Sequence, residues 1–501
     1  MVTDTIAAIS TALSDSGIGM IRISGENALD VGDNIFRTTS GKKILQNVKS
    51  HTIHYGYVVD NQYDKKEKAK TEGVREIAVD FAGSIVDEVM VSVMRAPRSF
   101  TAEDTVEISC HGGVLVMKKI LDLACRNGAR LAEPGEFTKR AFLNGRIDLS
   151  RAEAVMDVIY SQNELALKSS LNQLQGRLSD QIKELRNDLI YEIAFIESAL
   201  DDPEHISLEG YPQKLYDKIK VIRQKISHLI TTSDNGILMK EGISTVILGK
   251  PNVGKSSLMN LLLGEDRAIV TDIAGTTRDA LKESINLQGI TLNIIDTAGI
   301  HFTEDVVEKI GVEKAKKYAE DADLILCVVD SSVNLDDSDR EIFSLMRSKK
   351  SIVILNKTDL DQRVNEKNVR DFIKLNMDNF ECKDTIDCSS ENIFTNMVFV
   401  QTSAKDSIGL DMLEEEVKKM FFSGMIQSSN EVVITNVRHK NALVSANDSL
   451  GLVLKSIEDD MPEDFYSIDL MSAYSSLGLI IGEEVEDDLM EEIFSKFCMG
   501  K

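Results

Sequence analysis

The 501-residue sequence contains no tryptophan and only 6 cysteines. Those cysteines have neither a pairing pattern nor the close spacing of a metal site, so they exclude a disulfide scaffold and indicate a reducing compartment. No apolar run is long enough to span a bilayer, and no basic N-terminal segment leads into an apolar core. We therefore predict a cytoplasmic protein with no membrane contact. The cysteines are Cys110, Cys125, Cys327, Cys382, Cys388 and Cys498.

Basic residues are also scarce. Lysine and arginine number 57 against 82 aspartates and glutamates, which gives a net charge of −25. Nucleic-acid binding of low sequence specificity depends on lysine and arginine neutralising phosphates, so we expect most of this surface to repel RNA. An RNA partner must therefore be met at a local patch or with the help of another protein.

The length predicts two to four domains. Residues 1–145 mix strands, such as Gly19–Gly25 and Glu88–Met94, with helices, which predicts an α+β domain. Residues 241–423 alternate strand and helix, as expected of a doubly wound domain with parallel strands. Helices dominate residues 146–240 and return over 424–501, so the α/β domain is inserted into a discontinuous helical domain.

The first helical segment is predicted to contain two long helices. Apolar residues recur every three or four positions from Leu167 to Leu200 without a break, which predicts one amphipathic helix that ends before Pro203. A second helix is predicted from Tyr211 to Ser233, followed by a turn at Asn235-Gly236. We assign these helices a scaffolding role.

A phosphate-binding loop is predicted at Gly249–Ser256, which matches Gly-x-x-x-x-Gly-Lys-Ser. An apolar strand, Ser244–Leu248, precedes the loop, and a helix start follows it. The glycines allow backbone N–H groups to point at phosphate oxygens, and the helix N-terminus adds a positive dipole end. Lys255 is then expected to reach the β- and γ-phosphates and Ser256 to bind Mg²⁺. Taken alone, the motif leaves open a simple glycine-rich turn.

Four downstream motifs favour a GTPase. Asp296-Thr297-Ala298-Gly299 suits a Mg²⁺-linked aspartate and a γ-phosphate sensor. Asp359, in Asn356-Lys357-Thr358-Asp359, can accept two hydrogen bonds from guanine that adenine cannot offer. A backbone N–H in Ser403-Ala404-Lys405 can meet the guanine carbonyl, and a threonine in the switch segment Gly275–Asp279 can complete the Mg²⁺ shell.

Two features differ from the Ras-like switch. Ile300 occupies the position of the water-orienting glutamine, so another group must orient the water. Glu308 is one candidate, and a solvated helix charge is the alternative. The second difference concerns the cation that stabilises charge on the phosphates during hydrolysis, which is an arginine finger in many GTPases. In this chain the cation is either Arg278, which as easily forms a salt bridge, or a monovalent ion held by the side chain of Asn252. In the amino-terminal domain, Arg22 and Glu107 alternate with apolar neighbours and read by themselves as outward residues of strands.

The chain resembles the MnmE-type (TrmE) tRNA modification GTPases over essentially its whole length. The resemblance is carried by Gly19–Gly25, Ser99–Asp104, Pro134–Gly145, Val270–Asp279 and the closing Phe497–Lys501. The first, third and last of these are specific to the family. The segments 60–76 and 376–396 look like insertions, to which we assign no function.

For the amino-terminal domain, the resemblance implies a fold like that of folate-dependent aminomethyltransferases. The domain is expected to form a constitutive homodimer and to bind 5-formyltetrahydrofolate. The folate contacts of the family match Arg22, Glu107, Arg146 and Lys501, which favours function for the first two. The tail cysteine of the family matches Cys498.

For the GTPase domain, the resemblance implies K⁺ in place of an arginine finger. The matching K⁺ ligands are the side chain of Asn252 and the backbone carbonyls of Thr271, Ile273 and Thr276, while Mg²⁺ falls to Ser256 and Thr277. Glu308 matches the water-activating glutamate, and the GTPase domains of two subunits are expected to meet when GTP is bound. The predicted GTP contacts are Asn252, Val253, Gly254, Lys255, Ser256, Ser257, Thr271, Asp272, Ile273, Ala274, Gly275, Thr276, Thr277, Asp296, Thr297, Ala298, Gly299, Asn356, Lys357, Asp359, Ser403, Ala404 and Lys405.

The activity implied by the resemblance requires a flavin-dependent partner, the MnmG (GidA) protein, in a hetero-oligomer. Together the two proteins add an aminomethyl or carboxymethylaminomethyl group to carbon five of wobble uridine in tRNA, with most RNA contacts made by the partner. The alternative is a ribosome-assembly or signalling GTPase switch that modifies nothing. A folate aminomethyltransferase with an appended regulator is less favoured, because no general base stands out near Arg22 and Glu107.

Overall fold

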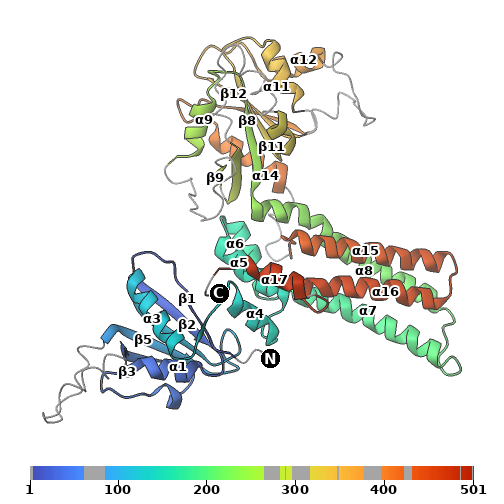
Figure 1. Cartoon of the computed structure of the whole chain (residues 1–501). Coiled ribbons are helices and arrows are strands. Elements are labelled where there is room, and N and C mark those ends of the chain that lie inside the picture. The colour runs from blue at the N-terminus through green and yellow to red at the C-terminus, as the bar shows by residue number, and fades with distance from the viewer. Residues whose placement is uncertain are drawn as a thin grey trace, which may run out of the picture. The chain divides into compact units, whose positions relative to one another are not determined.

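The computed structural model describes residues 4–60, 85–264, 282–287, 289–295, 316–346, 349–376, 396–422, 432–485, 487–498 and 500 (Figure 1). The chain divides into two compact units. One comprises Met1–Met156, Gln173–Pro203 and Leu470–Lys501, and the other comprises Asp157–Asn172 and Glu204–Asp469. Across the described ranges, no helix is both long and apolar enough to cross a membrane.

The first unit contains a seven-stranded sheet in the order β3-β4-β5-β6-β2-β1-β7. All neighbouring strands are antiparallel except β1 and β7, which run parallel. Helices α1 (Ala28–Ile35) and α3 (Val114–Arg126) pack on one face. The strands are β1 (Ile6–Ile9), β2 (Ser16–Ser24), β3 (Phe36–Thr38), β4 (Thr52–Val59), β5 (Ile85–Met94), β6 (Thr105–Gly112) and β7 (Arg130–Leu131).

Alternation along the strands explains why one face of this sheet is covered. Ile21 and Ile23 of β2 and Val106 and Ile108 of β6 enter the core beneath α1 and α3. Arg22, which lies between the two isoleucines, therefore projects to the opposite face, since successive side chains of a strand alternate. The α+β prediction for this region is confirmed.

Two corrections concern the long helices. The unbroken helix predicted from Leu167 to Leu200 is wrong, because the chain forms α6 (Glu164–Leu174) and α7 (Arg177–Asp201) with Gly176 between them. Gly176 has a φ of 94°, a left-handed conformation that ends a helix and favours glycine. A Cβ at this position would also lie 1.8 Å from the Arg151 guanidinium. The three-and-four spacing continues across the break, but in α6 its leucines Leu167 and Leu171 are 38% and 40% exposed, and Ala166, Ser170 and Gln173 are buried instead.

The turn predicted at Asn235-Gly236 is also wrong. Helix α8 runs without a break from Tyr211 to Glu241 and ends at Gly242, whose φ is 84°. Gly236 serves close packing instead, since a Cβ there would lie 2.2 Å from the carbonyl oxygen of Ile434. Helix α4 (Glu136–Leu143) precedes the first helical segment. The other helices of the helical segments are α5 (Leu149–Tyr160), α15 (Val437–Glu458), α16 (Glu463–Ile481) and α17 (Asp487–Ser495).

Gly236→Ala is expected to destabilise the protein by about 1–3 kcal/mol, because the added methyl overlaps a backbone carbonyl that cannot move aside. Alanine normally stabilises a helix interior relative to glycine by about 1 kcal/mol. Gly451→Ala in α15 is the matched control, since its Cβ would have the Arg223 guanidinium 3.6 Å away as nearest neighbour. Urea unfolding should move the midpoint down for Gly236→Ala and up for Gly451→Ala. Shifts of the same sign would contradict the packing explanation.

The second unit contains a six-stranded sheet in the order β13-β12-β11-β8-β10-β9. All neighbours are parallel except the β9–β10 hairpin. Leu324, Leu326 and Val328 of β11 face one apolar core, while Ile325 and Val329 face the other. A parallel sheet buried on both faces confirms the doubly wound prediction. The elements are β8 (Ile243–Leu248), α9 (Lys255–Leu262), β9 (Lys282–Leu287), β10 (Ile290–Ile295), β11 (Leu324–Asp330), α11 (Asp337–Ser344), β12 (Lys350–Asn356), α12 (Glu366–Asn376), β13 (Met397–Gln401) and α14 (Leu410–Phe422).

Candidate functional site

The loop between β8 and α9 has the backbone of a phosphate cradle. Gly249, Asn252 and Gly254 have φ values of 153°, 63° and 102°. Gly254 must be glycine for a second reason, because a Cβ there would lie 2.2 Å from the Asn356 amide nitrogen. The first residues of α9 receive no side-chain cap, so their N–H groups are available to an anion.

Lys255 lies across this loop. Its ammonium donates to the carbonyl oxygens of Gly249 at 2.6 Å and Lys250 at 2.8 Å. Burial lowers the pKa of Lys255, and within the described ranges it has no carboxylate in ion-pair contact. A partly buried ammonium with only carbonyl partners is electrostatically short of an anion, which a nucleotide phosphate supplies. The exposed Ser256 follows it, with a hydroxyl suited to Mg²⁺.

Asn356 connects the phosphate loop to the loop after β13. Its side chain is buried and donates to the Val253 carbonyl at 2.9 Å. Its Oδ1 accepts from the Ala404 amide at 3.1 Å and from the Thr402 hydroxyl at 3.2 Å. Asn356 therefore fixes Ser403-Ala404-Lys405 relative to the loop that would hold the phosphates.

Asp359, the carboxylate predicted to recognise the base, is held from one side. Ser403 donates its hydroxyl to Asp359 Oδ1 at 3.1 Å, and the side chain of Asp359 is otherwise exposed. Lys357, with a φ of 64°, places its ammonium 2.6 Å from Asp330 at the end of β11. Burial raises the pKa of Asp330, but hydrogen bonds from Lys357 and Ser332 outweigh burial and lower it. The loop is thus anchored while the Asp359 carboxylate remains open to a guanine base.

Sequence reasoning missed a second anchor of the phosphate loop. Lys250 contacts Asp336 at 2.8 Å and Asp339 at 2.7 Å, and both aspartates form the capping box that starts α11. The Lys250 hydrogen bond is the main cause that lowers the pKa of Asp336. The Asp-x-x-Asp capping pattern is visible in the sequence. The contact with Lys250 is not visible in the sequence, because Lys250 occupies a variable position of the Gly-x-x-x-x-Gly-Lys-Ser motif.

Several predicted site residues lie outside the described residues. They include the catalytic candidate Glu308, the folate candidate Lys501 and the Mg²⁺ candidate Thr277. No group of three or more His, Cys, Asp or Glu side chains that could hold a metal occurs in the part of the chain that the structure describes. The other predicted site residues that lie outside the described residues are Thr271, Asp272, Ile273, Ala274, Gly275, Thr276, Arg278, Asp296, Thr297, Ala298, Gly299 and Ile300.

In the first unit, Arg22 and Glu107 lie opposite each other on β2 and β6 and form an ion pair of 2.8 Å. Both side chains are largely buried, with 14% and 18% exposed. The Arg22 guanidinium lies 5.7 Å from the Phe100 ring centre, and the Arg146 guanidinium lies 5.2 Å from it. The structure therefore places Arg22 and Arg146 beside one aromatic ring and pairs Glu107 with Arg22; these three residues and Phe100 form the Arg22 cluster.

The carboxyl-terminal segment joins this cluster. Arg22 donates to the Gly500 carbonyl at 3.2 Å, and the Ser10 hydroxyl donates to the same oxygen at 3.2 Å. The Gly135 amide donates to the Cys498 carbonyl at 3.3 Å. Residues at the two ends of the sequence thus share one site on the sheet face away from α1 and α3.

The phosphate loop, the Asn356–Asp359 loop and the Ser403–Lys405 loop follow β8, β12 and β13, which are parallel strands of one sheet. Ligands of doubly wound folds bind at the carboxyl ends of such strands. This combination defines a P-loop GTPase.

Comparison with known proteins identifies the family. A family model for the GTP-binding protein TrmE N-terminus matches residues 5–146, and one for the MnmE helical domain matches residues 149–498. The tRNA modification GTPase MnmE of Lachnoclostridium phytofermentans is 52% identical over 501 residues, the whole of both chains. Those of Acetivibrio thermocellus and Bacillus subtilis are 44% and 42% identical over 99% of this chain and 99% and 100% of theirs. The chain belongs to the MnmE family of tRNA modification GTPases.

Proposed function

We propose that the protein is a K⁺-activated GTPase that modifies tRNA together with a flavin-dependent partner of the MnmG (GidA) type. The complex adds an aminomethyl or carboxymethylaminomethyl group to carbon five of wobble uridine, with 5-formyltetrahydrofolate as the one-carbon donor. The observation that carries the proposal is the 52% identity over the whole of both chains to a tRNA modification GTPase. The similarity spans the nucleotide loops and the Arg22 cluster together.

In the nucleotide site, Lys255 and the N–H groups at the start of α9 bind the β- and γ-phosphates. Ser256 and Thr277 hold Mg²⁺, which neutralises charge on the phosphate oxygens. Asn252 supplies a side-chain oxygen to K⁺, together with the carbonyls of Thr271, Ile273 and Thr276. The exposure of Asn252 supports this role, because its side-chain amide is accessible to an ion.

In the first unit, the Arg22 cluster suits the chemistry of a folate. A pterin ring presents N–H donors, which the Glu107 carboxylate can accept. The glutamyl tail carries carboxylates, which Arg22 and Arg146 attract, and Phe100 offers an aromatic surface for a flat ring. Lys501 follows Gly500, whose carbonyl contacts Arg22.

An exposed apolar surface supports the proposed homodimer. Ile53, Tyr55 and Met90 are 69%, 53% and 50% exposed. Tyr55 and Met90 lie directly opposite each other on β4 and β5, on the sheet face away from α1 and α3. Large apolar side chains gathered on a sheet face mark an interaction surface. A second copy of this domain would cover them.

A ribosome-assembly or signalling switch is the competing function, and it has no use for a folate. Isothermal calorimetry with 5-formyltetrahydrofolate is expected to detect binding by the wild-type protein. Arg22→Ala should weaken it by about 10–150-fold, because hydrogen bonds of charged groups contribute about 1.5–3 kcal/mol. Arg126→Ala, which removes an exposed arginine of α3, should bind as the wild type does. No folate binding by the wild type would favour the switch.

A further inference from the structure

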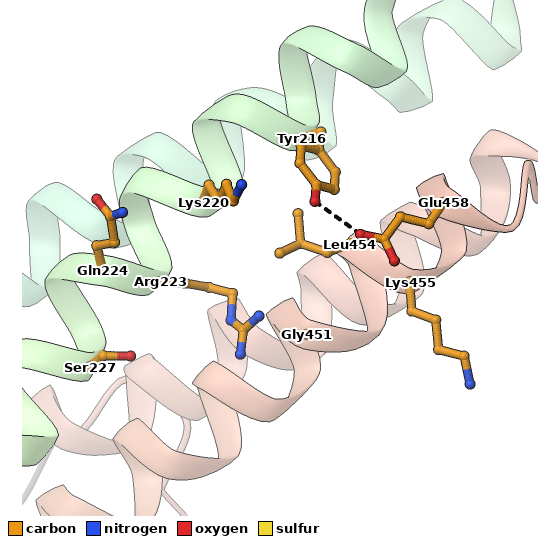
Figure 2. Close-up of a pocket in the computed structure, with 9 residues that line it drawn as sticks. All are labelled: Tyr216, Lys220, Arg223, Gln224, Ser227, Gly451, Leu454, Lys455 and Glu458. Carbon is orange, nitrogen blue, oxygen red and sulfur yellow. Dashed lines mark hydrogen bonds between the residues drawn. The ribbon is translucent and has the colours of Figure 1, made fainter.

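An open cavity of about 570 Å³ lies between α8 and α15, which pack along each other (Figure 2). Its position in the helical segments is remote in sequence from every nucleotide and folate residue discussed above. The cavity is lined by Tyr216, Lys220, Arg223, Gln224 and Ser227 of α8 and by Gly451, Leu454, Lys455 and Glu458 of α15.

The lining is cationic in a chain whose net charge is −25. Within the described residues, Lys220, Arg223 and Lys455 have no carboxylate in ion-pair contact. The one acidic side chain of the lining, Glu458, accepts a hydrogen bond from the Tyr216 hydroxyl at 2.9 Å. This bond raises the pKa of the Tyr216 phenol. The lining therefore carries three cations and a single carboxylate, which already has a partner.

The Arg223 guanidinium is held between the two helices. Its Nε donates to Asn447 Oδ1 at 3.2 Å, which leaves the four N–H bonds of its two terminal nitrogens available. Beside it lies Gly451, where a Cβ would be 3.6 Å from the guanidinium (Figure 2). Glycine in a helix interior costs about 1 kcal/mol relative to alanine. Here it leaves open space beside a positioned cation.

We propose that this cavity binds the phosphodiester backbone of RNA. Lys220, Arg223 and Lys455 neutralise phosphates, while Gln224 and Ser227 offer the amide and hydroxyl donors that commonly contact phosphate and ribose oxygens. The proposal rests on the proposed function, in which tRNA is the substrate. It supplies the local basic patch that so acidic a chain needs to meet RNA.

Backbone contacts of this kind position an RNA without reading its sequence. A substitution in the cavity is therefore expected to change the affinity for all tRNAs by a similar factor. It would act as an orienting contact, separate from the recognition of the wobble base. An acidic peptide is a different occupant, which the experiment below separates from RNA.

The test compares two double variants of the full-length protein. Lys220→Gln/Lys455→Gln removes two cavity charges, and Lys183→Gln/Lys214→Gln removes two exposed charges outside the cavity lining. Binding of a tRNA transcript is measured by fluorescence anisotropy across a salt series, with and without the flavin-dependent partner. The slope of log affinity against log salt should become shallower by about one unit per lost phosphate contact for the cavity variant, and should not change for the control. At 0.1 M salt its affinity should fall about tenfold or more.

GTP hydrolysis without tRNA should be the same in both variants and the wild type, which reports that they are folded. Equal tRNA affinity and equal salt slope in the cavity variant would overturn the proposal. The proposal would also be overturned if the wild-type protein bound no tRNA at any salt concentration. The same holds if the cavity variant lost only the binding of a polyglutamate peptide. The proposed function fails by a different result, which is wobble uridines that stay modified in cells lacking the protein. The tRNA affinities of the two variants would still decide the role of the cavity.

Discussion

Asp359→Asn is expected to lower GTP affinity by about 10²–10⁴-fold, because it removes an anionic acceptor of two hydrogen bonds from guanine. Each hydrogen bond to a charged group contributes about 1.5–3 kcal/mol. The loop itself should survive, since the asparagine oxygen can still accept from Ser403, which donates to Asp359 at 3.1 Å in the wild type. The anchor between Lys357 and Asp330 is also unaffected.

The same variant should bind xanthosine triphosphate better than the wild type does. Xanthine carries a carbonyl where guanine carries its amine, and the asparagine amide can donate to it. Competition of unlabelled nucleotides against a fluorescent GTP analogue measures both affinities. Asp361→Asn, an exposed neighbour with the same charge change, is the control and should bind GTP normally. Undiminished GTP affinity in Asp359→Asn would show that the base is recognised elsewhere.

GTP hydrolysis is expected to be fast in KCl and slower by about 10³-fold or more in NaCl at equal ionic strength. A cation beside the phosphates performs the task of an arginine finger, which is worth about 10³–10⁵ in rate. The effect should appear in the hydrolysis rate of the full-length protein, measured as phosphate release. Equal rates in both salts would remove K⁺ from the mechanism and return Arg278 to consideration.

Glu308→Ala should lower the hydrolysis rate in KCl by about 10²–10⁴-fold and leave GTP binding intact, because a general base acts on the water rather than on the nucleotide. Glu304→Ala, in the same segment, is the control with the same charge change. An active Glu308→Ala variant would favour the solvated helix charge and require another group to orient the water that Ile300 cannot.

Local patterns in the sequence predicted both sheets and the phosphate loop, since these depend on local spacing. A strand with alternating burial, such as β2, can be recognised because its apolar residues recur at every second position. The same reasoning failed at Gly176 and Gly236, because a glycine can end a helix or permit close packing inside one. Which of the two roles a glycine has depends on the atoms that pack against it. For Gly236 that atom is the carbonyl oxygen of Ile434, far along the chain.

The pairings within the sites could not be read from the sequence for the same reason. The ion pair of Arg22 and Glu107 depends on the register of β2 and β6, and the contact of Arg22 with Gly500 joins residues 478 positions apart. Lys250 finds Asp339 only because β8 and β11 are neighbours in the sheet. Spacing identifies residues capable of a given chemistry, while tertiary structure determines their partners.

We propose that the protein takes part in the modification of wobble uridine in tRNA. The most direct test of this proposal is mass analysis of tRNA nucleosides from a strain that lacks the gene, complemented with the wild type or with Asp359→Asn. The aminomethyl-type modifications at carbon five of wobble uridine are expected to disappear in the deletion strain. They should return with the wild type and not with the variant. Wobble uridines that remain fully modified in the deletion strain would contradict the proposal.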